Sequence, residues 1–237
     1  MRRALLYGID RVAIVRALFG ETGLRPRPLD NALLRSSHRA YRPNWSDYRY
    51  RPDESRSLLR RAGCRLGADG IFVCADERLQ LRFVARGAVA RRVQTLELVR
   101  AQLGRVGVAV VPVYATQPGH DQTLETGSFD VTLFAWFGSG AEGGGIKGLY
   151  GCGGDQNHIG YCQRIVTRDL DQSDRILDEV QRGRVLNRAD AQIARDVPTI
   201  PLFEVPLVVA VRSTIRNFTP AGFIDPTWNA EDWWLER

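Results

Sequence analysis

The chain has 237 residues, of which 44% are hydrophobic and 25% are charged, and its formal net charge is +6. This composition is ordinary for a globular protein and argues against disorder, and the length suits one large domain or two modest ones. Lys147 is the only lysine, and the arginines are scattered rather than gathered in one stripe, so we expect no nucleic-acid partner. No apolar run approaches the about 18 residues of a membrane span.

The N-terminal quarter alternates between helix signals and irregular sequence. Apolar residues recur at helical spacing from Ile9 to Phe19, and Asp10 is placed to cap this helix. The stretch 24–50 carries scattered prolines without periodicity, which indicates a long irregular connection. Residues 52–63 begin with proline and acids and end with arginines and glycine, which predicts a second helix.

A strand, a helix and a second strand follow in the middle of the chain. Residues 78–84 alternate between polar and apolar side chains and predict a half-buried strand. Residues 88–106 have an apolar stripe at helical spacing, and Gly107 closes this helix. Residues 108–114 are rich in β-branched side chains. The order predicts a βαβ unit with parallel strands and a right-handed crossover.

The remaining elements are less regular. We predict one or two helical turns over 120–126, a buried strand over 129–136, one or two helices between 171 and 196, and short strands over 199–203 and 207–212. The tail then places three tryptophans within seven residues, from Trp228 to Trp234. Aromatic side chains gathered so closely need a partner surface.

The four cysteines form two pairs with the same spacing, Cys64 with Cys74 and Cys152 with Cys162. This spacing does not fit a C-x-x-C zinc or redox motif, and no histidine stands at a ligand offset, so we predict no metal site. We predict instead that each pair closes a short loop through a disulfide, which indicates an oxidising compartment. The alternative, four reduced thiols in a cytosolic protein, remains open.

A glycine-rich stretch, 138–154, directly follows the strand predicted at 129–136. Its first six residues match the G-x-G-x-x-G pattern of dinucleotide-binding loops, but the further glycines make the required helix costly. Lys147 does not complete a phosphate-binding loop, because Gly148 stands where serine or threonine is required. We therefore predict no nucleotide cofactor, and no cofactor of any other kind.

The side chains around this stretch admit more than one function. Trp136 and Phe137 are either core aromatics or an apolar wall beneath a ligand, and both interpretations remain open. Asn157, between the second pair of cysteines, either closes a structural turn or contacts a ligand. The three histidines are far apart in the sequence, so we expect them at the surface and predict no catalytic residues.

Several segments together resemble the C-terminal half of family 5 extracellular solute-binding proteins, the peptide- and nickel-type receptors of ABC importers. No single motif is specific, but the series runs in family order along nearly the whole chain. The segments that carry the resemblance are 3–11 with 14–15, 50–63, 97–108, 127–136, 187–190, 196–203 and the tryptophan-rich tail.

The resemblance implies an α/β fold: a type II lobe like those of periplasmic binding proteins, with a mixed sheet flanked by helices. Residues 1–204 would form the second lobe, and residues 205–237 the hinge and the C-terminal segment that returns to a first lobe. That first lobe, with an export signal and a lipid anchor, would lie on residues absent from this chain. The expected location is extracellular or periplasmic, at the cell surface.

The resemblance also implies a peptide or similar small solute bound between the lobes, and ABC permease subunits that the full-length protein contacts. Peptide-binding relatives carry a tryptophan at the place of Trp136, and an aspartate shortly after it pairs with the ligand's amino group. That aspartate is missing after Trp136, and Glu142 is the acid that could replace it. The expected ligand-binding residues are Trp136, Phe137, Gly138, Ser139, Glu142 and Asn157.

Two other classes of function remain as alternatives. One is an enzyme, either a hydrolase or a nucleotide-dependent transferase, that uses the glycine-rich stretch. The other is a stand-alone interaction module that presents the tryptophan-rich tail.

Overall fold

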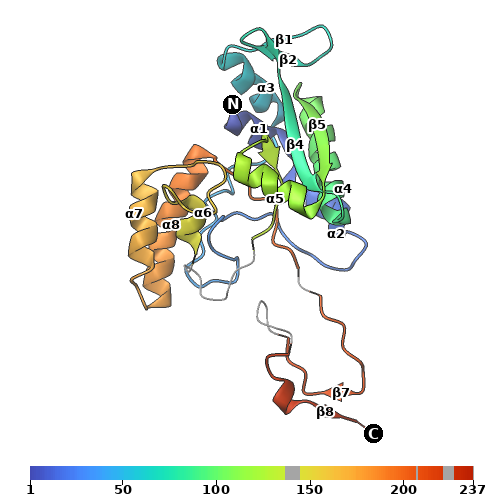
Figure 1. The fold of residues 1–237 in the computed structure, drawn as a ribbon, viewed down its shortest axis with the longest axis vertical. Helices are drawn as coiled ribbons and strands as arrows, with labels where there is room; N and C mark the ends of the chain where they lie inside the picture. Colours follow the sequence, from blue (N-terminus) through green and yellow to red (C-terminus); the bar gives the residue numbers. More distant parts are fainter. Residues whose placement is uncertain (137–144, 207, 221–226, 237) are drawn as a thin grey trace.

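The computed structural model describes residues 1–136, 145–206, 208–220 and 227–236 (Figure 1). Its helices are α1 (Arg2–Gly8), α2 (Arg11–Phe19), α3 (Pro52–Arg61), α4 (Ala90–Arg105), α5 (Gln117–Thr126), α6 (Ile146–Tyr150), α7 (Arg164–Ser173), α8 (Glu179–Asp196) and the 3₁₀ turn η1 (Ala230–Asp232). Its strands are β1 (Arg65–Leu66), β2 (Phe72–Cys74), β3 (Glu77–Arg78), β4 (Gln80–Arg86), β5 (Ala109–Ala115), β6 (Val131–Thr132), β7 (Ile215–Arg216) and β8 (Trp234–Leu235).

A parallel sheet in the order β5-β4-β6 organises the first part of the chain. β4 pairs with β5 along its whole length, starting from Gln80 opposite Ala109. α4 connects these strands and packs against both, as predicted for a βαβ unit. Gly107 makes the turn from α4 into β5 with a φ of +83°, and a Cβ at this position would meet the ring of Phe72 at 2.8 Å.

The first cysteine pair encloses a hairpin. β1 and β2 pair antiparallel, Gly67 N–H donates to the Ile71 carbonyl at 2.8 Å, and the Cys64–Cys74 disulfide closes the base. β3 adds a third antiparallel strand to β2. The α/β class is therefore confirmed, with parallel and antiparallel strands in separate sheets.

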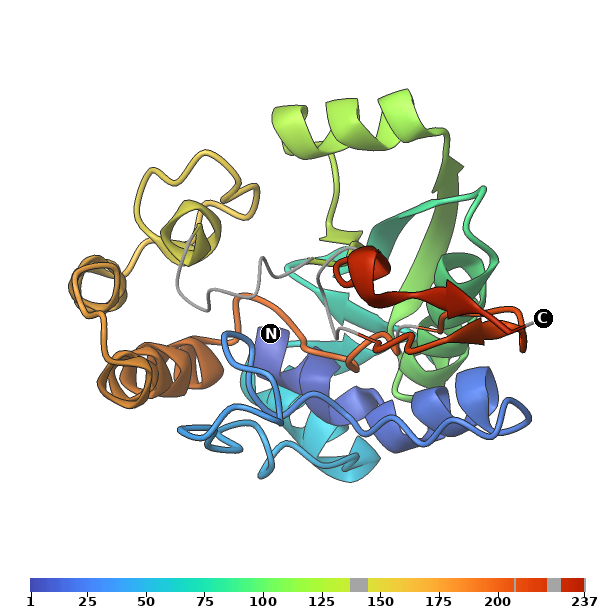
Figure 2. The same ribbon diagram turned by 90° about the horizontal axis from the view of Figure 1, so that it is seen from below.

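The second part of the chain is helical. α7 and α8 lie side by side on the side of the molecule away from α4 (Figures 1 and 2). Their facing side chains, among them Val166, Leu170, Leu186 and Ile193, form a core separate from the one beneath the sheet. Asp178 caps the N-terminus of α8, because its side chain accepts a hydrogen bond of 2.7 Å from Gln181 N–H.

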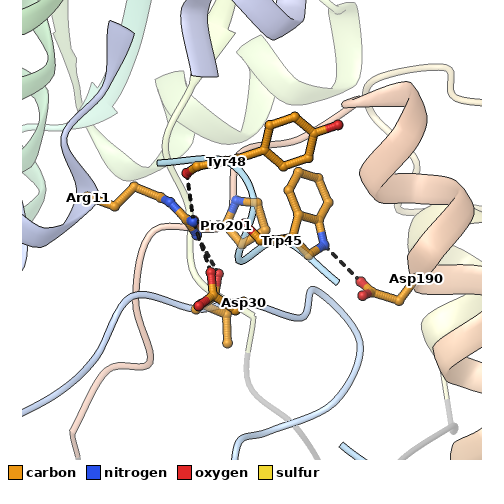
Figure 3. Close-up of polar contacts among 7 residues, drawn as sticks. Arg11, Asp30, Trp45, Tyr48, Asp190 and Pro201 are labelled. Atoms are coloured by element: carbon orange, nitrogen blue, oxygen red, sulfur yellow. Dashed lines mark hydrogen bonds and ion pairs between the residues drawn. The ribbon is translucent and has the colours of Figure 1, made fainter. Parts of the chain in front are cut away.

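The two parts meet at Arg11, a charged side chain that is only 6% exposed. Its guanidinium donates to Asp30 Oδ1 at 2.9 Å, to the Leu29 carbonyl at 2.7 Å and to the Pro201 carbonyl at 3.2 Å (Figure 3). The carbonyls of Trp45 and Tyr48 accept two further bonds. One arginine thus joins α2, the irregular stretch 24–50 and the chain that leaves α8.

The C-terminal segment from residue 205 projects away from the rest of the molecule (Figure 1). Its described hydrogen bonds join residues of the segment to one another, as in the β7–β8 pair and the bond from Trp228 Nε1 to the Thr219 carbonyl. Glu204, just before it, still contacts the body, because its Oε1 accepts from Ser36 N–H at 2.8 Å.

Some predicted elements differ from the structure. The strand at 199–203 reduces to one isolated bridge between Phe203 and Pro28, because two prolines interrupt this stretch. Among the described residues 208–212 there is no strand, and residue 207 lies outside the described part. β6 is two residues long rather than eight. α1 was not anticipated, and neither was the separate helix α7.

Candidate functional site

The parallel sheet brings the carboxyl ends of three strands to one edge, which we call the carboxyl edge. β4 ends at Arg86, β5 passes into α5 at Thr116, and β6 ends at Thr132. In open α/β sheets, ligands bind outside the carboxyl ends of the strands, because the connecting loops diverge there. We therefore take the carboxyl edge as the candidate site.

Trp136 lies just beyond β6 and is 42% exposed. Its indole packs edge-on against the ring of Phe134, with the centroids 4.7 Å apart. Part of the Trp136 side chain is therefore open to solvent, which favours the interpretation of Trp136 as an apolar wall over that of a core aromatic. The other residues expected beside it, Phe137, Gly138, Ser139 and Glu142, lie outside the described residues.

His120, on α5, is buried at the carboxyl edge and is only 2% exposed. Its Nε2 lies 3.2 Å from Thr132 Oγ1, and its Nδ1 lies 3.9 Å from Asp121 Oδ1. Burial lowers the pKa of His120, and the positive charge of Arg92 lowers this pKa further. The imidazole is therefore neutral at physiological pH. The expectation of surface histidines is wrong for His120 and also for His38, which is 7% exposed.

Two arginines lie half-buried beside His120: Arg86 at the end of β4 and Arg92 in the first turn of α4. In the described part of the chain neither guanidinium has an ion pair or hydrogen bond, and the buried Nε of Arg86 has no partner. Burial, together with the charges of Arg86 and Arg91, lowers the pKa of Arg92. The carboxyl edge is thus electropositive.

Sequence reasoning missed these arginines and His120, although one signal was present. The first turn of α4 carries Arg91 and Arg92, at a place where a helix usually carries acids. Scattered arginines elsewhere in the chain masked this exception. Only the fold shows that this helix start lies beside the end of β4 and beside α5.

The second disulfide, Cys152–Cys162, is formed as predicted. Within its loop, the Asn157 amide donates to the carbonyls of Gly151 and Tyr161, at 2.9 and 2.6 Å, and its Oδ1 accepts from Tyr161 N–H at 3.1 Å. These bonds hold the loop in shape. A ligand contact through Asn157 stays a prediction.

Within the described residues, no three side chains of His, Cys, Asp or Glu lie together where they could hold a metal ion. Of the described helices, none has both the length and the apolar character needed to cross a membrane.

Comparison with known families decides how this geometry is understood. The sequence model described as "Bacterial extracellular solute-binding proteins, family 5 Middle" matches residues 1–157, well over half of the chain. The chain belongs to this family. The resemblance drawn from scattered segments is thereby confirmed. The strand ends that form the carboxyl edge, Arg86, Thr116 and Thr132, all lie within the matched residues.

Curated relatives of family 5 carry different ligand names. "Oligopeptide-binding protein OppA" of Mycobacterium tuberculosis is 28% identical over 97% of this chain and 39% of its own length. "Heme-binding protein A" of Haemophilus influenzae is 22% identical over 94% of this chain and 40% of its own length. The chain therefore spans about two fifths of the curated relatives it matches.

Solved structures of low sequence identity share the fold. The oligopeptide-binding protein AppA of Bacillus subtilis, solved with a nonapeptide, has a TM-score of 0.80 at 16% identity, over 100% of this chain and 47% of its own. NikZ of Campylobacter jejuni, solved with Ni(L-His), has a TM-score of 0.80 at 20% identity, over 98% of this chain and 48% of its own. At these identities the likeness shows the fold of this family 5 chain and not its solute.

Proposed function

We propose that this family 5 chain is part of the solute-binding component of an ABC importer and recognises a peptide or similar small solute in a cleft between two lobes. The observation that carries the proposal is the exposed indole of Trp136 at the carboxyl edge of a chain whose family binds solutes. We propose no catalytic activity, since the family is one of solute-binding proteins.

We further propose that residues 1–204 form the second lobe of that receptor and that residues 205–237 form the hinge and the segment that returns to a first lobe. The hydrogen bonds of the C-terminal segment support this boundary, since those described stay within the segment. Its exposed apolar side chains suit a missing partner surface; they are Val205, Val208, Val211, Trp228, Trp234 and Leu235.

The proposed location is outside the cytoplasm, at the cell surface, with permease subunits as partners of the full-length protein. The two disulfides support this location, because such bonds persist in oxidising compartments. A lipid anchor on a preceding segment belongs to the same proposal.

A pool of short peptides tests the solute class. We expect the pool to raise the melting temperature of the chain, because a ligand that binds only the folded state stabilises it. Trp136→Ala should abolish the rise. The matched control is Trp228→Ala, an indole of similar exposure, 47%, on the C-terminal segment, and it should retain the rise. The proposal would be contradicted if both variants lost the rise in melting temperature equally, or if the wild type showed no rise at any pool concentration.

A further inference from the structure

A pocket of about 220 Å³ lies between α8 and the irregular stretch 24–50, and none of its lining residues belongs to the carboxyl edge. Three arginines line it: Arg39 and Arg42 from the irregular stretch, and Arg184 from α8. All three are exposed to solvent. Among the described residues, none forms an ion pair or a hydrogen bond with any of these three guanidinium groups. Two separate parts of the chain therefore bring three positive charges to one pocket.

The backbone that carries these arginines is held firmly against α8. The side-chain amide of Asn187, on α8, donates to the carbonyls of Ala40 and Gly183, and its Oδ1 accepts from Asn31 Nδ2 at 3.0 Å. Asn31 Nδ2 also donates to the Arg42 carbonyl at 2.9 Å. The two sides of the pocket are thus fixed against each other, so that a ligand would not have to order the backbone around it.

Gly183 permits this close approach. A Cβ at Gly183 would lie 2.6 Å from the Cβ of Ala40 and 2.5 Å from the Cε1 of His38. Any larger residue would therefore push the irregular stretch away from α8. Glycine destabilises the interior of a helix, yet it stands in the second turn of α8. The packing that shapes the pocket is therefore specified by the sequence.

The acids close to the pocket along the chain already have partners. Asp178 caps α8, and Glu179 lies 3.5 Å from the Nε2 of His38. Burial lowers the pKa of His38, and the positive charges of Arg182 and Arg35 lower it further, against the opposing effect of Glu179. Two more arginines thus add their charge to this part of the molecule. A concave surface with positive charges around it concentrates anions.

The arrangement of the arginines favours one class of anion. Each guanidinium presents paired N–H donors, which match the oxygens of a carboxylate or a phosphate. A carboxylate has one charge and two oxygens, and one arginine satisfies it. A phosphate group carries up to two charges and at least three acceptor oxygens near neutral pH, so that several arginines can share it.

We propose that Arg39, Arg42 and Arg184 form a binding site for a phosphate group, either inorganic phosphate or the phosphate of an anionic lipid head group. The site goes beyond the proposed solute-binding function, because it needs neither a peptide nor a first lobe. Asn187 and Ala40 form its polar and apolar floor and hold the arginines in place.

The first test is an NMR titration of the isotope-labelled chain with sodium phosphate, followed through the Nε–Hε signals of the arginines. Sodium chloride and sodium acetate at equal ionic strength are the comparisons. We expect saturable changes at Arg39, Arg42 and Arg184 with phosphate, none with chloride, and weaker binding of acetate. Each signal is assigned through its absence from the matching glutamine variant.

Variants locate the binding. The double variant Arg39→Gln with Arg184→Gln should bind phosphate at least about tenfold more weakly, because it lacks two of the three cationic donors. The matched control is Arg188→Gln, which removes an exposed arginine one turn further along α8. Arg188 lies outside the pocket and pairs with Asp169 at 3.4 Å, so its variant should bind phosphate as the wild type does. Arg184→Lys, which keeps the charge but not the paired donors, should bind with intermediate affinity.

Sedimentation with vesicles distinguishes the two sources of phosphate. The vesicles are phosphatidylcholine alone, or phosphatidylcholine and phosphatidylglycerol in equal parts. Binding to the mixed vesicles that the double variant loses assigns the site to a lipid head group. Saturable binding of inorganic phosphate without vesicle binding assigns it to the free ion. Either result supports the proposal.

Three results would overturn it. The first is the absence of a saturable response to phosphate together with no vesicle binding that depends on Arg39 and Arg184. The second is an equal loss of phosphate affinity in the double variant and in Arg188→Gln. The third is binding of acetate as tight as that of phosphate, which would show that the pocket does not select a phosphate group.

Discussion

The indole Nε1 of Trp45 donates a hydrogen bond of 3.1 Å to Oδ1 of Asp190 (Figure 3). Both residues are fully buried, Trp45 in the irregular stretch 24–50 and Asp190 on α8. The same carboxylate accepts from Ala32 N–H at 2.8 Å and from Asn44 Nδ2 at 2.7 Å. Asp190 therefore fixes a long loop without regular structure against the helical part of the molecule.

Trp45→Phe should lower the free energy of unfolding by about 1–3 kcal/mol. The substitution keeps most of the buried aromatic surface but removes one of the three donors to the Asp190 carboxylate. Urea denaturation measures the change. Trp228→Phe, at an exposed position, serves as the control and should differ little from the wild type. Equal effects of the two substitutions would contradict the role assigned to Trp45.

The stability contributed by Asp190 should depend on pH. Burial raises the pKa of its carboxyl from 3.8 to about 6, against the opposing effect of its three donors. The folded state therefore holds this proton more tightly than the unfolded state. The contribution is greatest below pH 4, and about 3 kcal/mol of it is lost as the pH rises to about 6.

Asp190→Asn provides the comparison for this pH dependence. The difference in unfolding free energy between the wild type and the variant should fall between pH 4 and pH 6 and stay constant above that range. A difference that grows with pH would show that the three donors outweigh burial and that the carboxyl titrates below its ordinary value.

Arg11→Met should lower the free energy of unfolding by about 3–5 kcal/mol, the range for removing one partner of a buried charged network. Methionine fills similar space but leaves Asp30 and four backbone carbonyls without their donor. Arg42→Met, at an exposed position, is the control. A variant Arg11→Met as stable as Arg42→Met would show that Arg11 does not join the two parts of the chain.

Loss of the Cys152–Cys162 bond, through serine at both positions, should lower stability by about 2–3 kcal/mol, because the short loop regains conformational entropy in the unfolded state. Amide exchange of Tyr161, whose N–H donates to Asn157, should become faster. Serine at Cys64 and Cys74 is the matched control, with the same ten-residue separation, and should leave this amide unchanged.

Truncation after Glu204 should leave the melting temperature nearly unchanged, because the described hydrogen bonds of the C-terminal segment do not reach the body. Calorimetry compares the shortened and full chains. A large drop in melting temperature would show that the segment belongs to the lobe itself.

Local signals predicted much of the fold. Asp10 caps α2 as expected, accepting from Ala13 N–H at 2.9 Å, and the apolar spacing of α4 and the β-branched run of β5 specified the βαβ unit. The stretch 24–50 was predicted to be irregular, but the contacts that order it could not be predicted, since they come from Arg11 and Asp190, outside the stretch. The family could be identified from the sequence only because several segments of low individual specificity occur in family order.

One residue at the carboxyl edge was singled out from the sequence: Trp136, because it follows a predicted strand. Its contact with a ligand stays a prediction. Arg86, Arg92 and His120 were missed because they come from three different elements, and only the pairing of β4 with its neighbours brings them together. No local sequence pattern indicates that these three side chains lie close together.

The most direct test of the central claim is an NMR titration of the chain with the peptide that gives the largest thermal shift. We expect saturable changes at the signals of Trp136, Thr132 and His120, and none at Trp228. Changes confined to another surface, such as the pocket of about 220 Å³ lined by Arg39, Arg42 and Arg184, would contradict a solute site at the carboxyl edge.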